Sequence, residues 1–214
     1  DGPHGWPRNV SNVDEQFLMF NVGNLGALRD NVRQTALEAA LLAEVLPALR
    51  LDASTCRHAD APLPSDARFN PQRIALFGHS MGASVAPLAA AASTRFGAVL
   101  LSGAGGSYLA NVLYKQRPLP VRGAAEALLG YPGTGHRLHE DDPALTVLQW
   151  ALDAADVAPY AAALRARPDG PHVLMQQGIV DRYILPPIAN TLSLAWGLDL
   201  AGEALDATHR ELTR

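Results

Sequence analysis

One short segment of the chain has the residue types and the spacing of a catalytic nucleophile. It reads Gly78-His79-Ser80-Met81-Gly82, the G-x-S-x-G spacing in which a sharp strand-to-helix turn exposes a serine hydroxyl. Small residues flank the serine because strand and helix approach closely at such a turn. The amide of Met81 then points to where an oxyanion forms when Ser80 attacks a carbonyl. The segment predicts acyl-transfer chemistry, with Met81 as an oxyanion donor.

The residues around this segment have the pattern that the turn requires. A lone G-x-S-x-G is a weak signal, because glycine and serine are common. Here residues 74–77 form an apolar run typical of a buried strand, and residues 81–94 are alanine-rich and predict a helix. The strand–turn–helix context therefore favours the catalytic interpretation over a chance match.

The remaining elements predict an α/β chain with a mostly parallel sheet and helices on both faces. Apolar residues recur at helical spacing from 28 to 49, with residues 28, 32, 36, 39, 42, 46 and 49 on one side, and Pro47 ends or kinks that helix. Further strands are expected at 97–101 and 172–178. Helical stretches are expected at 108–114, 123–129, 143–151, 159–166 and 187–198. No repeat or linker divides the chain, so residues 1–214 are expected to form a single domain.

With these elements in order, the chain resembles the α/β-hydrolase superfamily, especially bacterial esterases and lipases. The elbow around Ser80 carries the resemblance, together with "VLMQQGIVDRYILPP", residues 173–187, which is similar to the family's penultimate strand and acid-bearing loop. The resemblance implies that Asp181 is the catalytic acid and that residues 107–168 are a helical cap. An Asp at this place also commonly caps a turn. The implied substrate is a small-molecule ester, with no cofactor and no metal.

The resemblance also implies that part of the fold lies outside these residues. The opening "DGPHGWPR" is similar to the loop after the family's fourth strand. We therefore expect the preceding strands, and the loop donating a second oxyanion N–H, to be missing. Residues 1–214 alone would then expose a sheet edge and apolar faces, so we expect them to aggregate or to stay partly molten.

The catalytic base is the open question. The family order is serine, acid, histidine, and only His209 follows Asp181. The preceding segment, "DLAGEALDAT", has no strand-like run. His209 therefore follows the acid as the family's histidine does, but it does not follow a predicted strand. We therefore expect the base beyond Arg214. His79 adjoins the nucleophile, but neighbouring residues on such a turn point in different directions, so it is expected to pack or hydrogen-bond locally.

Two other segments invite a different chemistry. In "HRLHEDD", residues 136–142, His136 and His139 precede three acidic residues that together resemble metal ligands. Asp142-Pro143 is also a typical helix start, with Asp at the N-cap, so no metal site is predicted there. "SGAGGSY", residues 102–108, lacks the spacings of phosphate-binding loops, and flexible backbone beside the active site is the simpler interpretation.

Composition narrows the classes of partner. The net charge is −4, with 17 basic residues among 214 and no basic stripe, which argues against nucleic-acid binding. The single cysteine, Cys56, excludes a disulfide within the sequence. No apolar run reaches the roughly 18 residues of a membrane span. Lys115 is the single lysine. Compartment and oligomeric state stay open.

These observations predict a serine hydrolase that cleaves carboxylic esters. The apolar residues of 107–168 either line an acyl pocket or form the core of the cap. The elbow does not encode the leaving group, so an amidase, a thioesterase and an acyltransferase are alternatives on the same fold. A non-catalytic hydrolase-like domain that binds a ligand or partner is the alternative from another class, and the lack of a well-placed histidine favours it.

Overall fold

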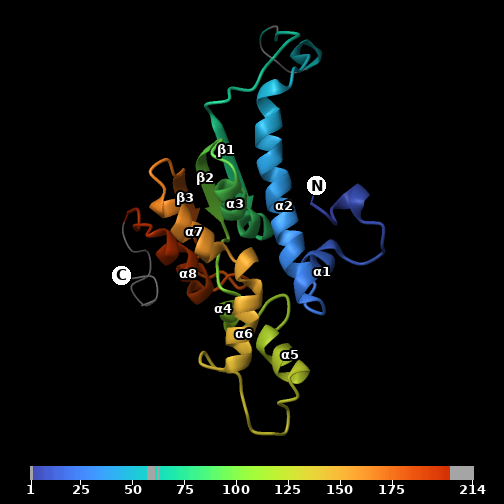
Figure 1. Ribbon diagram of the computed structural model, residues 1–214, viewed down its shortest axis with the longest axis vertical. Coiled ribbons are helices and arrows are strands. Elements are labelled where there is room, and N and C mark those ends of the chain that lie inside the picture. Colours follow the sequence, from blue (N-terminus) through green and yellow to red (C-terminus); the bar gives the residue numbers. More distant parts are fainter. Residues whose placement is uncertain (1, 57–60, 62, 203–214) are drawn as a thin grey trace.

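The chain forms a three-stranded parallel sheet with helices around it (Figure 1). The computed structural model describes residues 2–56, 61 and 63–202. The strands are β1 (Ile74–His79), β2 (Phe96–Ser102) and β3 (His172–Gln176), in the order β1-β2-β3 with both pairs parallel. The prediction of an α/β chain with a parallel sheet is confirmed.

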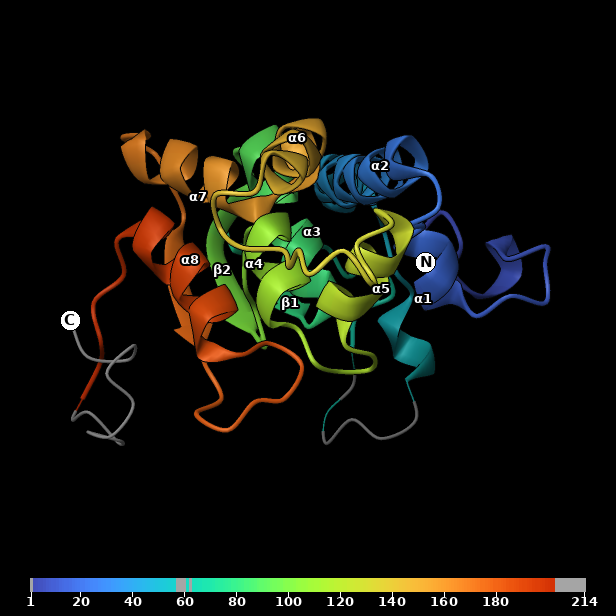
Figure 2. The ribbon, with the colours of Figure 1, turned by 90° about the horizontal axis from the view of Figure 1, so that it is seen from below.

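One face of the sheet is covered by helices. Helix α3 (Met81–Ala92) lies against β1 and β2, and α2 (Leu25–Val45) and α7 (Val157–Ala166) pack against α3 on the same side (Figure 2). Val99 and Leu101 of β2 point into this layer and are fully buried. The alanines of α3 let the neighbouring helices come close, so the core is built largely from small side chains.

Helix α2 buries a slightly different face from the one expected. It ends at Val45, two residues before Pro47, in agreement with the sequence. Leu42 is 54% exposed, although the spacing of large apolar residues placed it on the buried side. The helix packs on the alanine-rich α3, and small side chains allow the closer approach. Its buried residues are Leu28, Val32, Ala36, Ala40 and Ala43.

The opposite face of the sheet presents apolar side chains to solvent. Phe77, Leu100 and Leu174 are register partners across the three strands, so they form one row. Their exposed fractions are 65%, 36% and 50%. The expected helices on both faces are thus not found among the residues that the structure describes. We call this row the open sheet face.

Three helices gather at the end of the molecule toward which the strands run: α4 (Tyr108–Tyr114), α5 (Val121–Leu128) and α6 (Pro143–Leu152) (Figure 1). They have a small core of their own, whereas Leu128, Val147 and Trp150 are largely exposed. The buried apolar side chains here therefore pack against one another and stabilise this group of helices. The buried members of this core are Val112, Leu113, Leu138 and Leu145.

The remaining helices pack at the sides of the main layer. Helix α1 (Glu15–Met19) contacts α2, and α8 (Pro186–Trp196) contacts α7. Within the described ranges, no helix is both long and apolar enough to cross a membrane. Short 3-10 turns occupy Trp6–Arg8, Leu46–Ala48, Ala53–Thr55 and Asp153–Ala155.

A buried carboxylate, Asp156, ties α4 to α7. It is 3% exposed, and it accepts hydrogen bonds from the amides of Ser107 and Tyr108 at 3.0 and 3.1 Å. It also caps α7 through the amide of Ala158 and accepts from the side chain of Gln149. The N-terminus of α4 is thereby fixed relative to the main layer.

Candidate active site

Ser80 lies in a strained backbone conformation at the junction of β1 and α3. Its φ and ψ are 51° and −116°, in the left-handed half of the map that residues with a Cβ rarely adopt. Its amide donates to the carbonyl oxygen of Ser102 at 2.9 Å, which holds the turn against the end of β2. The residue is exposed. Strain of this kind persists where the surroundings fix it, and it is frequent at active sites.

Of the two flanking glycines, only Gly78 is sterically required by the described surroundings. A Cβ on Gly78 would lie 2.6 Å from the carbonyl oxygen of Gly82 and 3.0 Å from Cα of Ala83. A Cβ on Gly82 would meet no atom within 4 Å. The close approach of strand and helix is therefore present on the Gly78 side, whereas the space beside Gly82 is open.

The amide of Met81 is placed where the sequence predicted an oxyanion donor. Met81 is the first residue of α3, and an amide at that position has no acceptor within its helix. The helix dipole adds positive potential there. The side chain is 43% exposed, so it does not close off the turn. An anion beside Ser80 would meet this amide.

Asp181 and Ser80 come close to each other beside Gly103, which lies in the loop after β2. Gly103, directly after β2, has φ +56°, and a Cβ on it would lie 3.9 Å from the amide nitrogen of Ser80 and 4.0 Å from Oδ2 of Asp181. Both atoms, together with Cε1 of the His79 ring at 3.9 Å, thus lie within 4.0 Å of one point. The loops after β1, β2 and β3 bring the two predicted residues together at the carboxyl ends of the strands, the usual place for a site in an open α/β sheet.

Asp181 caps its own turn through one carboxylate oxygen, and no described residue donates a hydrogen bond to the other. Oδ1 accepts hydrogen bonds from the amides of Tyr183 and Ile184 at 2.7 and 3.0 Å. Oδ2 accepts no hydrogen bond from any residue that the structure describes. The turn-capping role and the triad role are therefore compatible, because Oδ2 remains available to an imidazole N–H.

Lys115 is part of this neighbourhood, although its sequence context predicts no functional role for it. Its Nζ donates to the carbonyl oxygen of Tyr183 at 2.9 Å, which ties the end of α4 to the Asp181 loop. Burial lowers the pKa of Lys115, while the charge of Asp181 acts in the opposite direction. Its being the single lysine of the chain was the one available signal.

The glycine-rich loop after β2 is packed against the segment that follows Asp181. A Cβ on Gly105 would lie 2.7 Å from Cγ2 of Ile188 and 2.9 Å from Cγ2 of Ile184. The amide of Gly106 donates to the carbonyl oxygen of Ile188 at 3.0 Å. The glycines therefore allow two loops to pack closely, which is a more specific role than the flexibility expected from the sequence.

No histidine in the described part of the chain is hydrogen-bonded to the Ser80 hydroxyl. His79 is exposed, and its Nδ1 lies 3.2 Å from Oγ of Ser102, so it hydrogen-bonds locally as predicted. His172 begins β3 and pairs with Ala98, at the end of the sheet away from Ser80. His209 lies outside the described residues. Ser80 and Asp181 thus lie near the same glycine, and the His79 ring lies there too, since its Cε1 would be 3.9 Å from a Cβ on Gly103. Among the described residues, no hydrogen bond joins a histidine to Ser80 or to Asp181.

Two hollows of the described surface lie away from Ser80. They measure about 380 and 540 Å³, and both open at the amino-terminal ends of the strands. The larger is lined by residues such as Ala75, Ala98 and His172, and neither is lined by Ser80 or Asp181. Because sites in such sheets form at the carboxyl ends, we place the candidate site at Ser80.

Comparisons with known proteins do not assign the chain to a family. No family model matches it, and no curated protein and no solved structure matches it either. The candidate site is therefore defined by the Ser80 turn, the Met81 amide and the Asp181 carboxylate.

Proposed function

We propose that this protein is a serine hydrolase of the α/β-hydrolase type that cleaves carboxylic esters through an acyl-enzyme on Ser80. The observation that carries the proposal is the strained Ser80 turn, with the carboxylate of Asp181 reaching the same glycine, Gly103. In enzymes with such a turn, the strained backbone conformation exposes the serine hydroxyl so that it can act as a nucleophile. The nearby acid, with one oxygen that accepts no hydrogen bond from a described residue, supports a triad rather than an isolated turn.

In the proposed reaction Ser80 Oγ attacks the ester carbonyl and a histidine takes its proton. The oxyanion accepts a hydrogen bond from the Met81 amide. The protonated histidine then donates to the leaving alcohol, and an acyl-enzyme remains. Water, activated by the same histidine, releases the acid and restores Ser80. Asp181 orients the histidine and stabilises its charged form through Oδ2.

The histidine of this proposal lies outside the residues that the structure describes. His209, which follows Asp181 in the chain, is among the residues outside that description. No cofactor or metal takes part in the proposed steps, because the serine, the histidine and the acid supply the nucleophile and all the proton transfers.

The proposed substrate is a small ester with an aliphatic acyl group. The apolar helices α4, α5 and α6 follow directly from the loop after β2 that carries Gly103, so they stand at the same end of the sheet as Ser80 (Figure 1). A chain-length series of nitrophenyl esters tests this part of the proposal. We expect turnover to rise above acetate, and no preference for longer acyl chains would refute it.

The test of the function is turnover by the full-length protein and by Ser80→Ala. We expect the variant to lose nitrophenyl ester hydrolysis while keeping the circular dichroism spectrum of the parent. Ser54→Ala, in the loop before β1, is the matched control and is expected to keep full activity. Persisting activity in Ser80→Ala would overturn the nucleophile assignment.

A non-catalytic binding domain is the second candidate, and one observation favours it. Within the described ranges the Ser80 hydroxyl has no histidine partner, and Ser80 without a base is a weak nucleophile. This candidate predicts no turnover of ester, amide or thioester substrates by the full-length protein. Hydrolysis of an amide or a thioester in preference to an ester would instead favour the related enzyme classes.

A further inference from the structure

A second group of side chains with ligand chemistry lies between α5 and α6, apart from the residues of the proposed reaction. His136, His139 and Asp142 each contribute one ligand atom, and these atoms all lie within 4.8 Å of one another. We call these three residues the His-His-Asp cluster. Two imidazoles and one carboxylate are a common ligand set for zinc.

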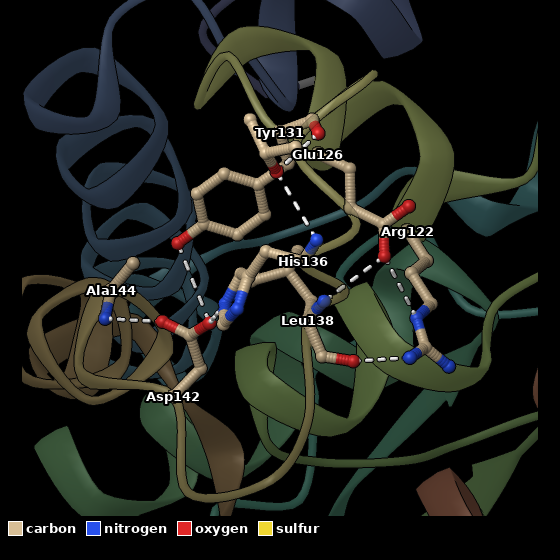
Figure 3. Close-up of polar contacts among 8 residues, drawn as sticks. Arg122, Glu126, Tyr131, His136, Leu138, Asp142 and Ala144 are labelled. Atoms are coloured by element: carbon tan, nitrogen blue, oxygen red, sulfur yellow. Dashed lines mark hydrogen bonds and ion pairs between the residues drawn. The ribbon is translucent and has the colours of Figure 1, made fainter.

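Asp142 is fixed in place before any ion binds. It is 2% exposed, and its Oδ1 accepts the amide of Ala144 at 2.9 Å as the N-cap of α6. Its Oδ2 faces His136 Nε2 at 2.9 Å and the Tyr131 hydroxyl at 3.4 Å (Figure 3). One carboxylate oxygen is thus presented beside His136.

Hydrogen bonds fix the backbone of the loop at Leu138, which lies between the two histidines. Leu138 is fully buried, and its amide donates to Oε1 of Glu126 at 3.0 Å. Arg122 donates to the carbonyl oxygen of Leu138 and pairs with Glu126 (Figure 3). His136 and His139 therefore flank a fixed point of the backbone.

The His136 ring is also oriented by its neighbours. The edge-to-face contact with Tyr131 has a centroid separation of 4.4 Å and an interplanar angle of 89°. The His139 ring lies 5.9 Å from that of His136 and is exposed. His136 and Asp142 are thus held by packing and hydrogen bonds, although both histidines are exposed.

We propose that His136, His139 and Asp142 bind one zinc ion, with water in the fourth position. Zinc bonds of about 2.0–2.1 Å hold tetrahedral ligand atoms roughly 3.3 Å apart, so the exposed His139 side chain closes on the other two. Imidazole nitrogens favour zinc over magnesium and calcium, which prefer oxygen ligands. The Tyr131 hydroxyl and the Ala144 amide orient Asp142 as outer partners of the ligand set.

Bound zinc would link the loop before α6 to the N-terminus of that helix. The competing explanation is purely structural: His136 and Asp142 form a hydrogen-bonded pair and Asp142 caps α6. His139 separates the two explanations, because its side chain makes no hydrogen bond to Asp142 in the described structure. A structural pair predicts no effect of His139→Ala, whereas a zinc site predicts the loss of one ligand.

The experiment measures zinc binding by the full-length protein. Metal content after dialysis against a slight excess of zinc is determined by mass spectrometry, and affinity by competition with a chromophoric chelator. We expect one zinc per chain and a rise in the melting temperature on adding zinc. Esterase activity is not a readout, so failure of this proposal is separate from failure of the proposed function.

Two variants and one control complete the test. His139→Ala and Asp142→Asn are each expected to weaken zinc affinity at least tenfold, and Asn keeps the helix cap. His4→Ala, a histidine outside the cluster, is expected to bind zinc like the parent. Should the parent retain no stoichiometric zinc, or should His139→Ala bind it as tightly, the proposal is overturned.

Discussion

Replacing Gly78 by alanine tests the geometry of the Ser80 turn most sharply. The new Cβ would lie 2.6 Å from the carbonyl oxygen of Gly82 and 2.9 Å from its carbonyl carbon, and both are backbone atoms. Neither can swing away as a flexible side chain would, so the start of α3 must move. Overpacking of this kind costs about 1–3 kcal/mol of unfolding free energy. For a domain of this size each kcal/mol lowers the melting temperature by roughly 2–4 °C.

The same shift would disturb the proposed chemistry. The atoms that must yield adjoin Met81, whose amide is the proposed oxyanion donor, and Ser80 itself. A misplacement of about 1 Å can cost roughly 100-fold in rate. We therefore expect Gly78→Ala to lower kcat for ester hydrolysis by one to two orders of magnitude, about 10- to 100-fold, beyond its effect on stability.

Gly82→Ala is the matched control, since its Cβ would meet no atom within 4 Å. In α3 an alanine restricts the unfolded chain, so we expect no loss of stability and a gain of up to about 0.4–1 kcal/mol. Thermal unfolding followed by circular dichroism, with ester turnover on the same samples, compares the pair. Equal effects of the two substitutions, or a neutral Gly78→Ala, would refute the reasoning.

Four further predictions concern other residues. Asp181→Asn should lower ester turnover by about 10⁴-fold on the logic of the triad, and a loss under about tenfold would reject its role. Asp156→Ala leaves buried amides of two helices without an acceptor. Chemical denaturation should therefore show that the free energy of unfolding falls by about 3–5 kcal/mol. A loss of less than about 1 kcal/mol would show that this hydrogen-bond network is dispensable. The hydrogen bond from Arg8 lowers the pKa of Glu38 from 4.5 to about 2, so this contact adds stability above about pH 4.5 that is lost as the pH falls toward 2. A carboxyl NMR titration should move the Glu38 midpoint back toward 4.5 in Arg8→Ala, and an unchanged midpoint would contradict the pairing. Residues 1–214 expressed alone should bind a hydrophobic dye and aggregate through the open sheet face, whereas a monomer with a cooperative thermal transition would contradict this.

The order of the elements could be predicted from the sequence because its signals are local. Short apolar runs bounded by glycine or polar residues marked the strands, and Pro47 and Pro143 marked the end and the start of helices. The buried face of α2 was placed less well. Large apolar residues dominated the pattern, whereas packing against the alanines of α3 selects small side chains such as Ala40 and Ala43.

The meeting of Ser80 and Asp181 could be expected only through a family resemblance. The two residues are brought together by the register of three strands and by a glycine of positive φ, and none of these is a local property. The same is true of Lys115, whose contact with Tyr183 joins distant parts of the chain. Asp156 is similar, since its cap on α7 is local and its bonds to α4 are not.

The strand pattern alone did not predict the open sheet face, whereas the family resemblance did imply exposed apolar faces in residues 1–214. The apolar character of all three strands predicted cover on both sides, and in the described residues only the side facing α3 has it. Continuous apolar strands are typical of sheets covered on both faces, whereas Phe77, Leu100 and Leu174 are exposed in the described structure. Their exposure is the physical basis for expecting residues 1–214 to associate when they are expressed alone.

The most direct test of the central claim is labelling of the full-length protein with a fluorophosphonate, read by intact mass and by peptide mapping. Such probes react with a serine only when a base activates it. We predict one label per chain, located on Ser80 and absent from Ser80→Ala. A full-length, folded protein that takes no label, or takes it on another serine, would contradict the claim that Ser80 is the nucleophile of a hydrolase.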